Sequence, residues 1–172
     1  MKFIVDCMLG KLGKWLRILG FDALYLNKAE DKDLLSLARS ENRTLLTKDQ
    51  GLLRSAAGHT CLFIESDSWP EQLAQVLDAF KLRAKAKPHS RCLACNVGLR
   101  RIPKKSVRNL VPPFVLARAS SFAACPACGR IFWPGTHFRD MDWTIDRILG
   151  DKKTRIKGPV EKGEKARRVP SR

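Results

Sequence analysis

Two pairs of cysteines, each with two residues between its members, constrain the second half of this chain more than any other feature. The pairs are Cys92 with Cys95 and Cys125 with Cys128, and 29 residues separate them. The short gap lets a tight turn aim both sulfurs at one ion, and two such turns complete the tetrahedral thiolate shell that Zn²⁺ prefers. Four thiolates leave no open coordination position. The pattern therefore predicts a zinc ribbon in which the metal is structural.

Two other interpretations of these cysteines are weaker. Disulfides are disfavoured because the chain begins without a recognisable export signal, and reducing compartments keep thiols free. A redox CxxC normally follows a strand and opens a helix, and that context is missing here. The other two cysteines, Cys7 and Cys61, adjoin apolar runs, so we expect them to lie in the core.

Four short apolar runs occupy the first half of the chain, at residues 3–5, 23–26, 44–46 and 61–64. Each run is continuous rather than alternating, which is typical of parallel strands buried on both faces. Apolar residues at helical spacing lie between the runs. This rhythm predicts an α/β fold built on a parallel sheet.

Helix boundaries are also marked in the sequence. Ser68 and Glu71 have the spacing of a capping box, and Thr47 and Gln50 repeat it. The helix that opens at Ser68 is expected to run on through 81–87 and to stop before a proline. A last short helix is expected over 140–149, ended by a glycine.

The positive charge of the chain is unevenly distributed. The net charge is +16, and residues 1–87 contribute +3 of it whereas residues 88–172 contribute +13. Such a surface attracts polyanions, so nucleic acid is the leading partner class. A membrane partner is disfavoured, because no long apolar run and no clean amphipathic helix accompany the charge. We expect a cytoplasmic protein.

These patterns divide the chain into three parts. Residues 1–87 are expected to form the α/β domain, and residues 88–150 to form the zinc ribbon with its short helix. Residues 151–172 are basic and contain few large apolar side chains, so we expect a flexible tail.

Several aspartates follow the expected strands. In an open parallel sheet the carboxyl ends of the strands share one edge, so acids placed after them converge. Such a cluster favours Mg²⁺ or Mn²⁺, which would activate water for hydrolysis of a phosphodiester. The candidate catalytic acids are Asp6, Asp31, Asp33, Asp49 and Asp67, with Glu30 and Glu65 as reserves.

Each acid also has a structural interpretation. Asp31, Asp33 and Asp67 lie where an aspartate stabilises the start of a helix. Asp6 is harder to explain in this way, because it stands next to an apolar strand with no charged neighbour in sequence. Asp6 and Asp49 are therefore the expected ligands of the Mg²⁺ or Mn²⁺ ion.

Basic side chains near these acids are candidates for nucleic-acid binding. Lys11, Lys14 and Arg17 recur every three residues along the expected first helix, where they would lie beside a phosphate near Asp6. A solvated helix face is the competing explanation. Two further candidates are Lys48 and Arg54.

Two stretches of the first half resemble the Mut-seven C-terminal RNase domain family. They are FIVDCMLGKLGKWLRILGFD at residues 3–22 and RTLLTKDQGLL at residues 43–53. The two cysteine pairs and the following FWPGTH at residues 132–137 match the second part of that family. The resemblance covers residues 2–148 and leaves out the basic tail.

The resemblance implies a fold and an activity. Members combine a PIN-like domain, a three-layer α/β parallel sheet with helices on both faces, with a small zinc ribbon behind it. PIN-like domains are metal-dependent ribonucleases, which implies Asp6 and Asp49 as metal-binding acids and Asp31 or Asp33 as a third. The usual third acid is a glutamate on a helix, whereas this sequence offers Glu30 together with those two aspartates.

Three functional hypotheses follow. The first is a Mg²⁺- or Mn²⁺-dependent ribonuclease whose zinc ribbon and tail help to bind RNA. The alternative is a non-catalytic RNA- or ribosome-binding protein in which the acidic site is vestigial. A toxin-like nuclease controlled by a protein partner is compatible with the resemblance, but the zinc ribbon does not suggest it.

Overall fold

The computed structural model describes residues 1–150, with the side chains of 136–140 left out. The chain divides into two compact units, Met1–Gly135 and a second one that begins at Thr136. Among the described helices, none has the length and apolarity needed to cross a bilayer.

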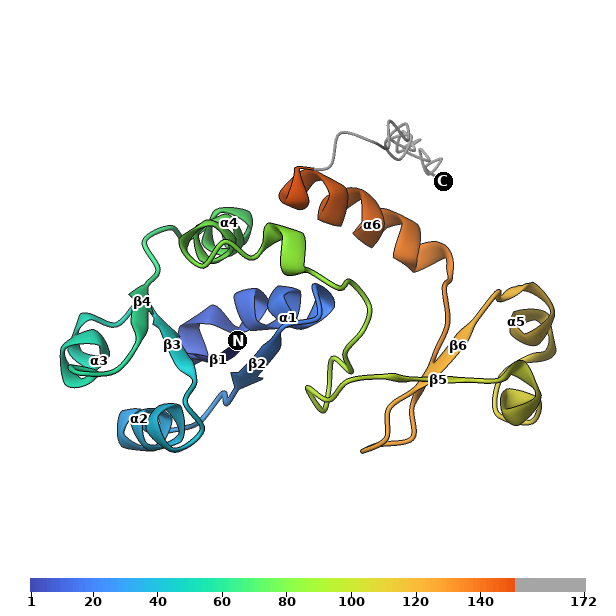
Figure 1. The fold of residues 1–172 in the computed structure, drawn as a ribbon, viewed down its shortest axis with the longest axis horizontal. Coiled ribbons are helices and arrows are strands. Elements are labelled where there is room, and N and C mark those ends of the chain that lie inside the picture. Colours follow the sequence, from blue (N-terminus) through green and yellow to red (C-terminus); the bar gives the residue numbers. More distant parts are fainter. Residues whose placement is uncertain (151–172) are drawn as a thin grey trace, which may run out of the picture. The chain divides into compact units, whose positions relative to one another are not determined.

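A parallel sheet of four strands lies at the centre of the first half (Figure 1). Its order is β2-β1-β3-β4, with neighbouring strands parallel throughout. The four apolar runs of the sequence form these strands, as predicted. The strands are β1 (Lys2–Val5), β2 (Asp22–Tyr25), β3 (Thr44–Thr47) and β4 (Cys61–Phe63).

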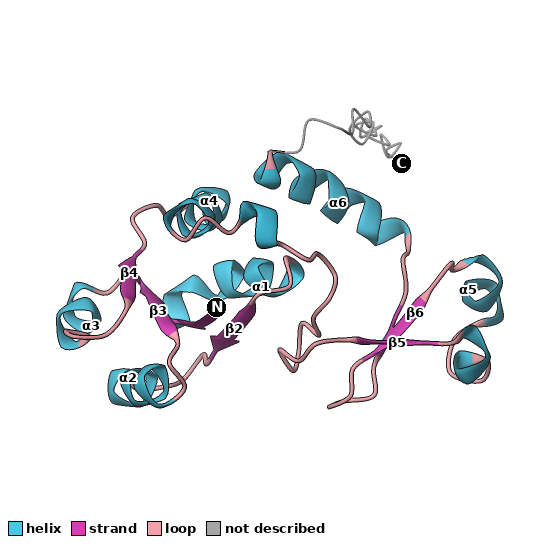
Figure 2. Ribbon diagram, in the orientation of Figure 1, coloured by secondary structure: helices cyan, strands magenta, loops and turns pink. Residues whose placement is uncertain are grey.

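Helices cover both faces of this sheet, which confirms the expected three-layer α/β fold (Figures 1 and 2). On one face, Ile4 and Leu45 of the sheet pack against Leu34 and Leu52 of the helices. On the other face, the helix that follows β1 packs against the helix that follows β4. The helices are α1 (Gly10–Ile18), α2 (Asp31–Ser40), α3 (Gln50–Ser55) and α4 (Trp69–Ala79), with the short turn η1 (Cys7–Leu9) before α1.

The predicted capping boxes are wrong. Ser68 does precede α4, but its side chain makes no capping hydrogen bond, and the carboxylate of Glu71 accepts a hydrogen bond from Ser66 Oγ. At α3 the capping residue is Asp49 rather than Thr47. A carboxylate directly before the helix reaches its free amides better than the more distant hydroxyl does.

The predicted extension of α4 through 81–87 is also wrong. Phe80 packs its ring against Phe3, with centroids 5.7 Å apart, and Leu82 is buried. To turn Leu82 inward, Lys81 adopts a φ of 51°. The amide of Leu82 then donates to the carbonyl of Leu77, which ends the helix in a Schellman motif. A short turn, η2 (Arg83–Lys85), follows.

The second half of the first unit contains a small antiparallel sheet of order β5-β6-β7. A segment with two short helical pieces connects β5 to β6 and packs Val107, Val111 and Val115 against Phe122. We call this segment, residues 103–121, the ribbon insert. The elements are β5 (Arg100–Ile102), η3 (Lys104–Val107), α5 (Pro113–Arg118), β6 (Phe122–Ala124) and β7 (Ile131–Phe132).

The last helix, α6 (Thr136–Leu149), begins four residues before the predicted one and ends before Gly150 as expected. Within it, the guanidinium of Arg147 lies 4.7 Å from the ring centre of Trp143. The predicted tail at 151–172 lies outside the described residues.

Candidate functional site

The order of the strands creates one natural position for a site. From β1 the chain crosses to β2 on one side, and from β2 it crosses back to β3 on the other side of β1. Ligands of open α/β sheets bind at such a switch point, at the carboxyl ends of the strands. Asp6 follows β1 directly, and Thr47 ends β3.

A buried hydroxyl links the two strongest acid candidates. The Oγ1 atom of Thr47 donates to Oδ2 of Asp6 at 2.8 Å and accepts from the backbone amide of Asp49 at 2.9 Å. Thr47 is fully buried and Asp6 is 4% exposed, whereas Asp49 is exposed. The pKa of the Cys7 thiol is raised first by its hydrogen bond to Asp6. Asp6 and Asp49 therefore lie together at the switch point.

Asp49 has one carboxylate oxygen committed to the fold. Its Oδ1 accepts from the amides of Gly51 at 2.5 Å and Leu52 at 3.0 Å, which fixes the side chain. Within the described part of the chain, Oδ2 has no hydrogen-bond partner. Mg²⁺ is commonly held by one or two carboxylates with several retained waters and the phosphates of its substrate. Two fixed hard oxygen donors at this edge fit that chemistry.

Among the described residues, the other acid candidates do not join this pair in a group of metal-ligating side chains. Asp31 and Asp33 are exposed in the first turn of α2, where they favour the helix dipole. Asp67 forms an ion pair with Lys48. Of the reserves, Glu30 pairs with Lys32 at 2.7 Å. Among the described residues, no three carboxylates form a group that could hold a metal ion.

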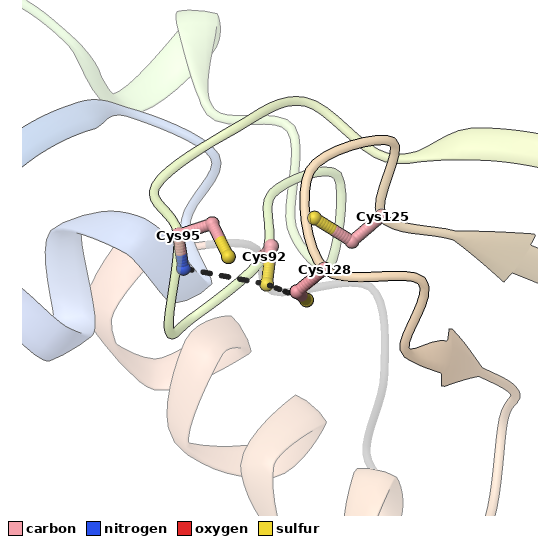
Figure 3. Close-up of side chains that lie close together, drawn as sticks. All are labelled: Cys92, Cys95, Cys125 and Cys128. Atoms are coloured by element: carbon pink, nitrogen blue, oxygen red, sulfur yellow. Dashed lines mark hydrogen bonds between the residues drawn. The ribbon is translucent and has the colours of Figure 1, made fainter.

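The four predicted zinc ligands do come together (Figure 3). The sulfurs of Cys92, Cys95, Cys125 and Cys128, which we call the cysteine quartet, all lie within 4.8 Å of one another. Those of Cys92 and Cys128 are 3.9 Å apart. A tetrahedral ion with Zn–S bonds of about 2.3 Å requires sulfurs about 3.8 Å apart. The quartet thus fits structural zinc.

The quartet is unevenly protonated without a cation. Hydrogen bonding to Cys128 is the largest cause that raises the pKa of Cys95 to about 12. For Cys125, burial opposes ionisation, but the backbone amides of Cys128 and Ala127 outweigh it and lower the pKa to about 7. A divalent cation removes this conflict, because it stabilises all four thiolates. The two remaining cysteines are not ligands: Cys61 is half-buried, and Cys7 is exposed, so the expectation that Cys7 lies in the core is wrong.

Comparison with known proteins agrees with this arrangement. Residues 1–145 match the family described as Mut7-C RNAse domain. The chain belongs to the Mut7-C RNAse domain family. It is also similar to a protein named Exonuclease mut-7 homolog from Homo sapiens, at 38% identity over 101 residues. That match covers 55% of this chain and 12% of the human protein. No solved structure gives a significant match.

The Mut7-C match contains both Asp6 with Asp49 and the cysteine quartet. It also contains the basic candidates, whose environments differ. Lys11 and Lys14 are exposed on α1, and the ammonium of Lys11 lies 5.3 Å from the ring centre of Trp69. Arg54 is exposed in the last turn of α3. Lys48 is held by Asp67 and by the carbonyl of Ser66.

Arg17 joins the two halves of this Mut7-C chain. Its Nε donates to the carbonyl of Ala23 at 2.7 Å, and its Nη1 donates to the carbonyl of Leu93 at 2.8 Å. Nearby, the amide of Ala23 donates to Oδ1 of Asn96 at 3.1 Å. The first cysteine turn, residues 92–95, and the following Asn96 are therefore hydrogen-bonded to Arg17 and to β2.

Asp22 organises the same contact, and sequence reasoning missed it. Its Oδ1 accepts from Arg43 at 2.6 Å and from Asn96 Nδ2 at 2.8 Å. Burial alone would raise the pKa of Asp22, but the hydrogen bonds from Arg43 and Asn96 hold it below its ordinary value of 3.8. Thr47 was also missed as a link between acids. The contacts of Asp22 with Arg43 and Asn96, and that of Thr47 with Asp6, join segments far apart along the chain, so no local sequence signal marks them.

Proposed function

We propose that this chain is a metal-dependent ribonuclease whose active site lies at the carboxyl ends of β1 and β3. The observation that carries the proposal is the hydrogen-bonded series Asp6–Thr47–Asp49 at the switch point of a parallel sheet. Membership of a family described as an RNase domain supports the same reaction, and the name of the human relative agrees with a nuclease.

Asp6 and Asp49 would hold a Mg²⁺ or Mn²⁺ ion. A third acid from Asp31 or Asp33 stays a prediction, because no described third carboxylate forms a metal-binding group with this pair. A divalent ion supplies a water of lowered pKa and neutralises charge on the scissile phosphate. The contribution of the chain's own residues is to hold both carboxylates in position before substrate binds. Thr47 fixes Asp6, and the amides at the start of α3 fix Asp49, so neither carboxylate has to be reoriented when substrate arrives.

The remaining parts of the proposal concern partners. The cysteine quartet would hold structural zinc, and Lys11, Lys14 and Arg54 would contact phosphates near the acids. Arg17 and Lys48 already have internal partners, so we assign them a weaker share of RNA binding. The division at residue 87, the cytoplasmic location, the RNA-binding tail and any ribosomal or protein partner stay predictions.

The deciding experiment is cleavage of end-labelled single-stranded and structured RNA with Mn²⁺ or Mg²⁺. We expect Asp49→Asn to abolish cleavage while RNA affinity stays equal or rises, because one negative charge is lost. Asp78→Asn is the matched control, since Asp78 is an exposed acid near the end of α4 that pairs with Arg83. Cleavage retained by Asp49→Asn would overturn the assignment.

A second candidate function is a non-catalytic RNA- or ribosome-binding protein. The observation that favours it is the lack, among the described residues, of any three carboxylates that form a group able to hold a metal ion. Binding of RNA without cleavage in either metal, by a chain with its zinc retained, would select this candidate.

A further inference from the structure

The part of the sequence that forms the small antiparallel sheet and its insert contains no acidic side chain. From residue 79 to residue 139 there is no Asp or Glu, while Lys and Arg recur throughout. Within the described residues, the basic side chains of the ribbon and its insert form no ion pair apart from Arg91, which faces Asp22. Among the described residues, no acidic partner therefore neutralises this charge.

Part of this charge is gathered around one hollow of the ribbon insert. Lys104, Lys105 and Arg108, together with Leu116 of α5, line a depression of about 290 Å³, which we call the basic hollow. All three basic residues are exposed. Beneath them Val107 is fully buried in the small core of the insert, which fixes the backbone that carries these cations.

A second hollow of different chemistry begins on the same segment. It has a volume of about 430 Å³, and its lining includes the half-buried rings of Phe132 and Trp133, the exposed Arg130 and the exposed side chain of Leu110. We call it the aromatic hollow. Leu110 is two residues from Arg108, so the chain leads directly from the basic hollow into this one.

We propose that the two hollows form a binding surface for single-stranded RNA, with phosphates in the basic hollow and a base in the aromatic hollow. Grooves that bind single strands combine cations along the backbone with aromatic side chains on which bases stack. An acidic protein segment would use the cations, but it offers no flat ring for Phe132 and Trp133. The proposal takes RNA as the ligand from the proposed function, while the surface itself is separate from Asp6 and Asp49.

The charge arm of the test replaces Lys104, Lys105 and Arg108 together by Gln in the full chain. Binding of a fluorescent unstructured RNA of about 20 nucleotides is measured by anisotropy, without Mg²⁺ or Mn²⁺, and over a range of salt. We expect affinity to fall on the order of tenfold, with the salt slope shallower by about 2, because each phosphate contact on a single strand contributes about 0.7.

The matched control for the charge arm removes the same charge elsewhere. Lys2, Arg39 and Lys81 are exposed and line neither hollow. Their replacement by Gln should change the slope less than the first variant does. Equal losses in both variants would overturn the proposal in favour of an effect of net charge. A third variant, with Lys104→Arg, Lys105→Arg and Arg108→Lys, keeps the charge and should bind as the parent does.

The stacking arm compares two exposed apolar residues. Leu110 is 68% exposed and lines the aromatic hollow, whereas Phe114 is 65% exposed and lines neither hollow. Leu110→Glu should weaken binding at least fivefold more than Phe114→Glu, since base stacking contributes strongly at such sites. Equal losses of RNA affinity in the two variants would overturn the proposed RNA surface. Displacement of the labelled RNA by polyglutamate as effectively as by unlabelled RNA would overturn it too. Because no catalytic metal is added, a failure of cleavage leaves this measurement unaffected.

Discussion

The Nδ2 atom of Asn96, which directly follows the first cysteine turn, donates to the carboxylate of Asp22 in β2 at 2.8 Å. The two residues are 74 positions apart, and Asp22 also accepts from Arg43 at 2.6 Å. The side chain of Arg43 is only 9% exposed. One carboxylate therefore stabilises both a buried guanidinium and the contact between the sheet and the ribbon.

Replacing Asp22 by Asn should destabilise the whole first unit. The variant leaves the guanidinium of Arg43 with only Glu41 as its carboxylate partner. Hydrogen bonds to charged groups contribute about 2 kcal/mol, so a loss of that size in the free energy of unfolding is expected. Urea denaturation measures it. The control is Asp78→Asn, which disrupts the exposed ion pair with Arg83 and should cost under about 1 kcal/mol.

The same carboxylate predicts a dependence of stability on pH. The pKa of Asp22 is lower in the folded chain than its ordinary value of 3.8, so protonation favours the unfolded state. The stabilisation is fully present above the ordinary pKa and disappears as the pH falls through the folded pKa, below 3.8. Melting temperatures of parent and Asp22→Asn should therefore converge as the pH falls below 3.8. A difference that stays constant with pH would contradict this account.

Removal of zinc should destabilise more than the ribbon. A metal held by the quartet would stabilise the first cysteine turn, and β2 would lose its hydrogen bond to Asn96 if that turn opened. We expect one bound zinc per chain and a melting temperature lower by roughly 10 °C in Cys125→Ser. Metal analysis and calorimetry measure both. Cys61→Ser, at a half-buried cysteine outside the quartet, should keep its zinc.

Two glycines allow a test of how the segment at Lys87, which we call the linker, is held against the parallel-sheet half of the first unit. Gly20 has a φ of +87°, and a Cβ there would meet the carbonyl oxygen of Lys87 at 2.3 Å. Gly58 has a φ of +79°, but a Cβ there would meet nothing within 4 Å. Gly58→Ala should therefore cost about 1 kcal/mol of backbone strain. Gly20→Ala should cost at least about 3 kcal/mol, because the linker must also move. Equal losses in denaturant would show that the close approach is unimportant.

Thr47 should affect activity through the acids that it links. Thr47→Val keeps the shape of the side chain but removes the hydroxyl that Asp6 accepts from, which leaves a buried carboxylate less satisfied. We expect a loss of about 1–3 kcal/mol in stability and a fall in cleavage rate beyond any loss of folded protein. Thr47→Ser restores the hydroxyl and should recover both. Cleavage by Thr47→Val at the parental rate would argue against this role.

Local patterns in the sequence were enough to predict the sheet. The four apolar runs became β1 to β4 because residues such as Ile4 and Leu45 are buried between two layers of helices, and continuous apolarity is the mark of that environment. The cysteine quartet was predictable for a similar reason, since each pair is defined within a single turn. The pair Asp6 and Asp49 followed from strand ends, although Thr47 between them did not.

Features that depend on distant partners were not predictable. The end of α4 is set by burial of Leu82 and by the packing of Phe80 on Phe3, and no local signal announces either contact. Asp67 follows β4 as expected, but its carboxylate forms an ion pair with Lys48. In both cases the decisive interaction joins segments that are far apart in sequence.

The contact between Asn96 and β2 also protects the sheet from wrong partners. β2 is an edge strand, and an exposed edge is a template on which another chain can add a strand and aggregate. The outward amide of Ala23 is occupied by Asn96, and its carbonyl by Arg17. The ribbon thus acts as a cover for the edge. A chain that ends before residue 91 would lack Asn96 and leave the amide of Ala23 open at this edge. It should aggregate more readily than the full chain does.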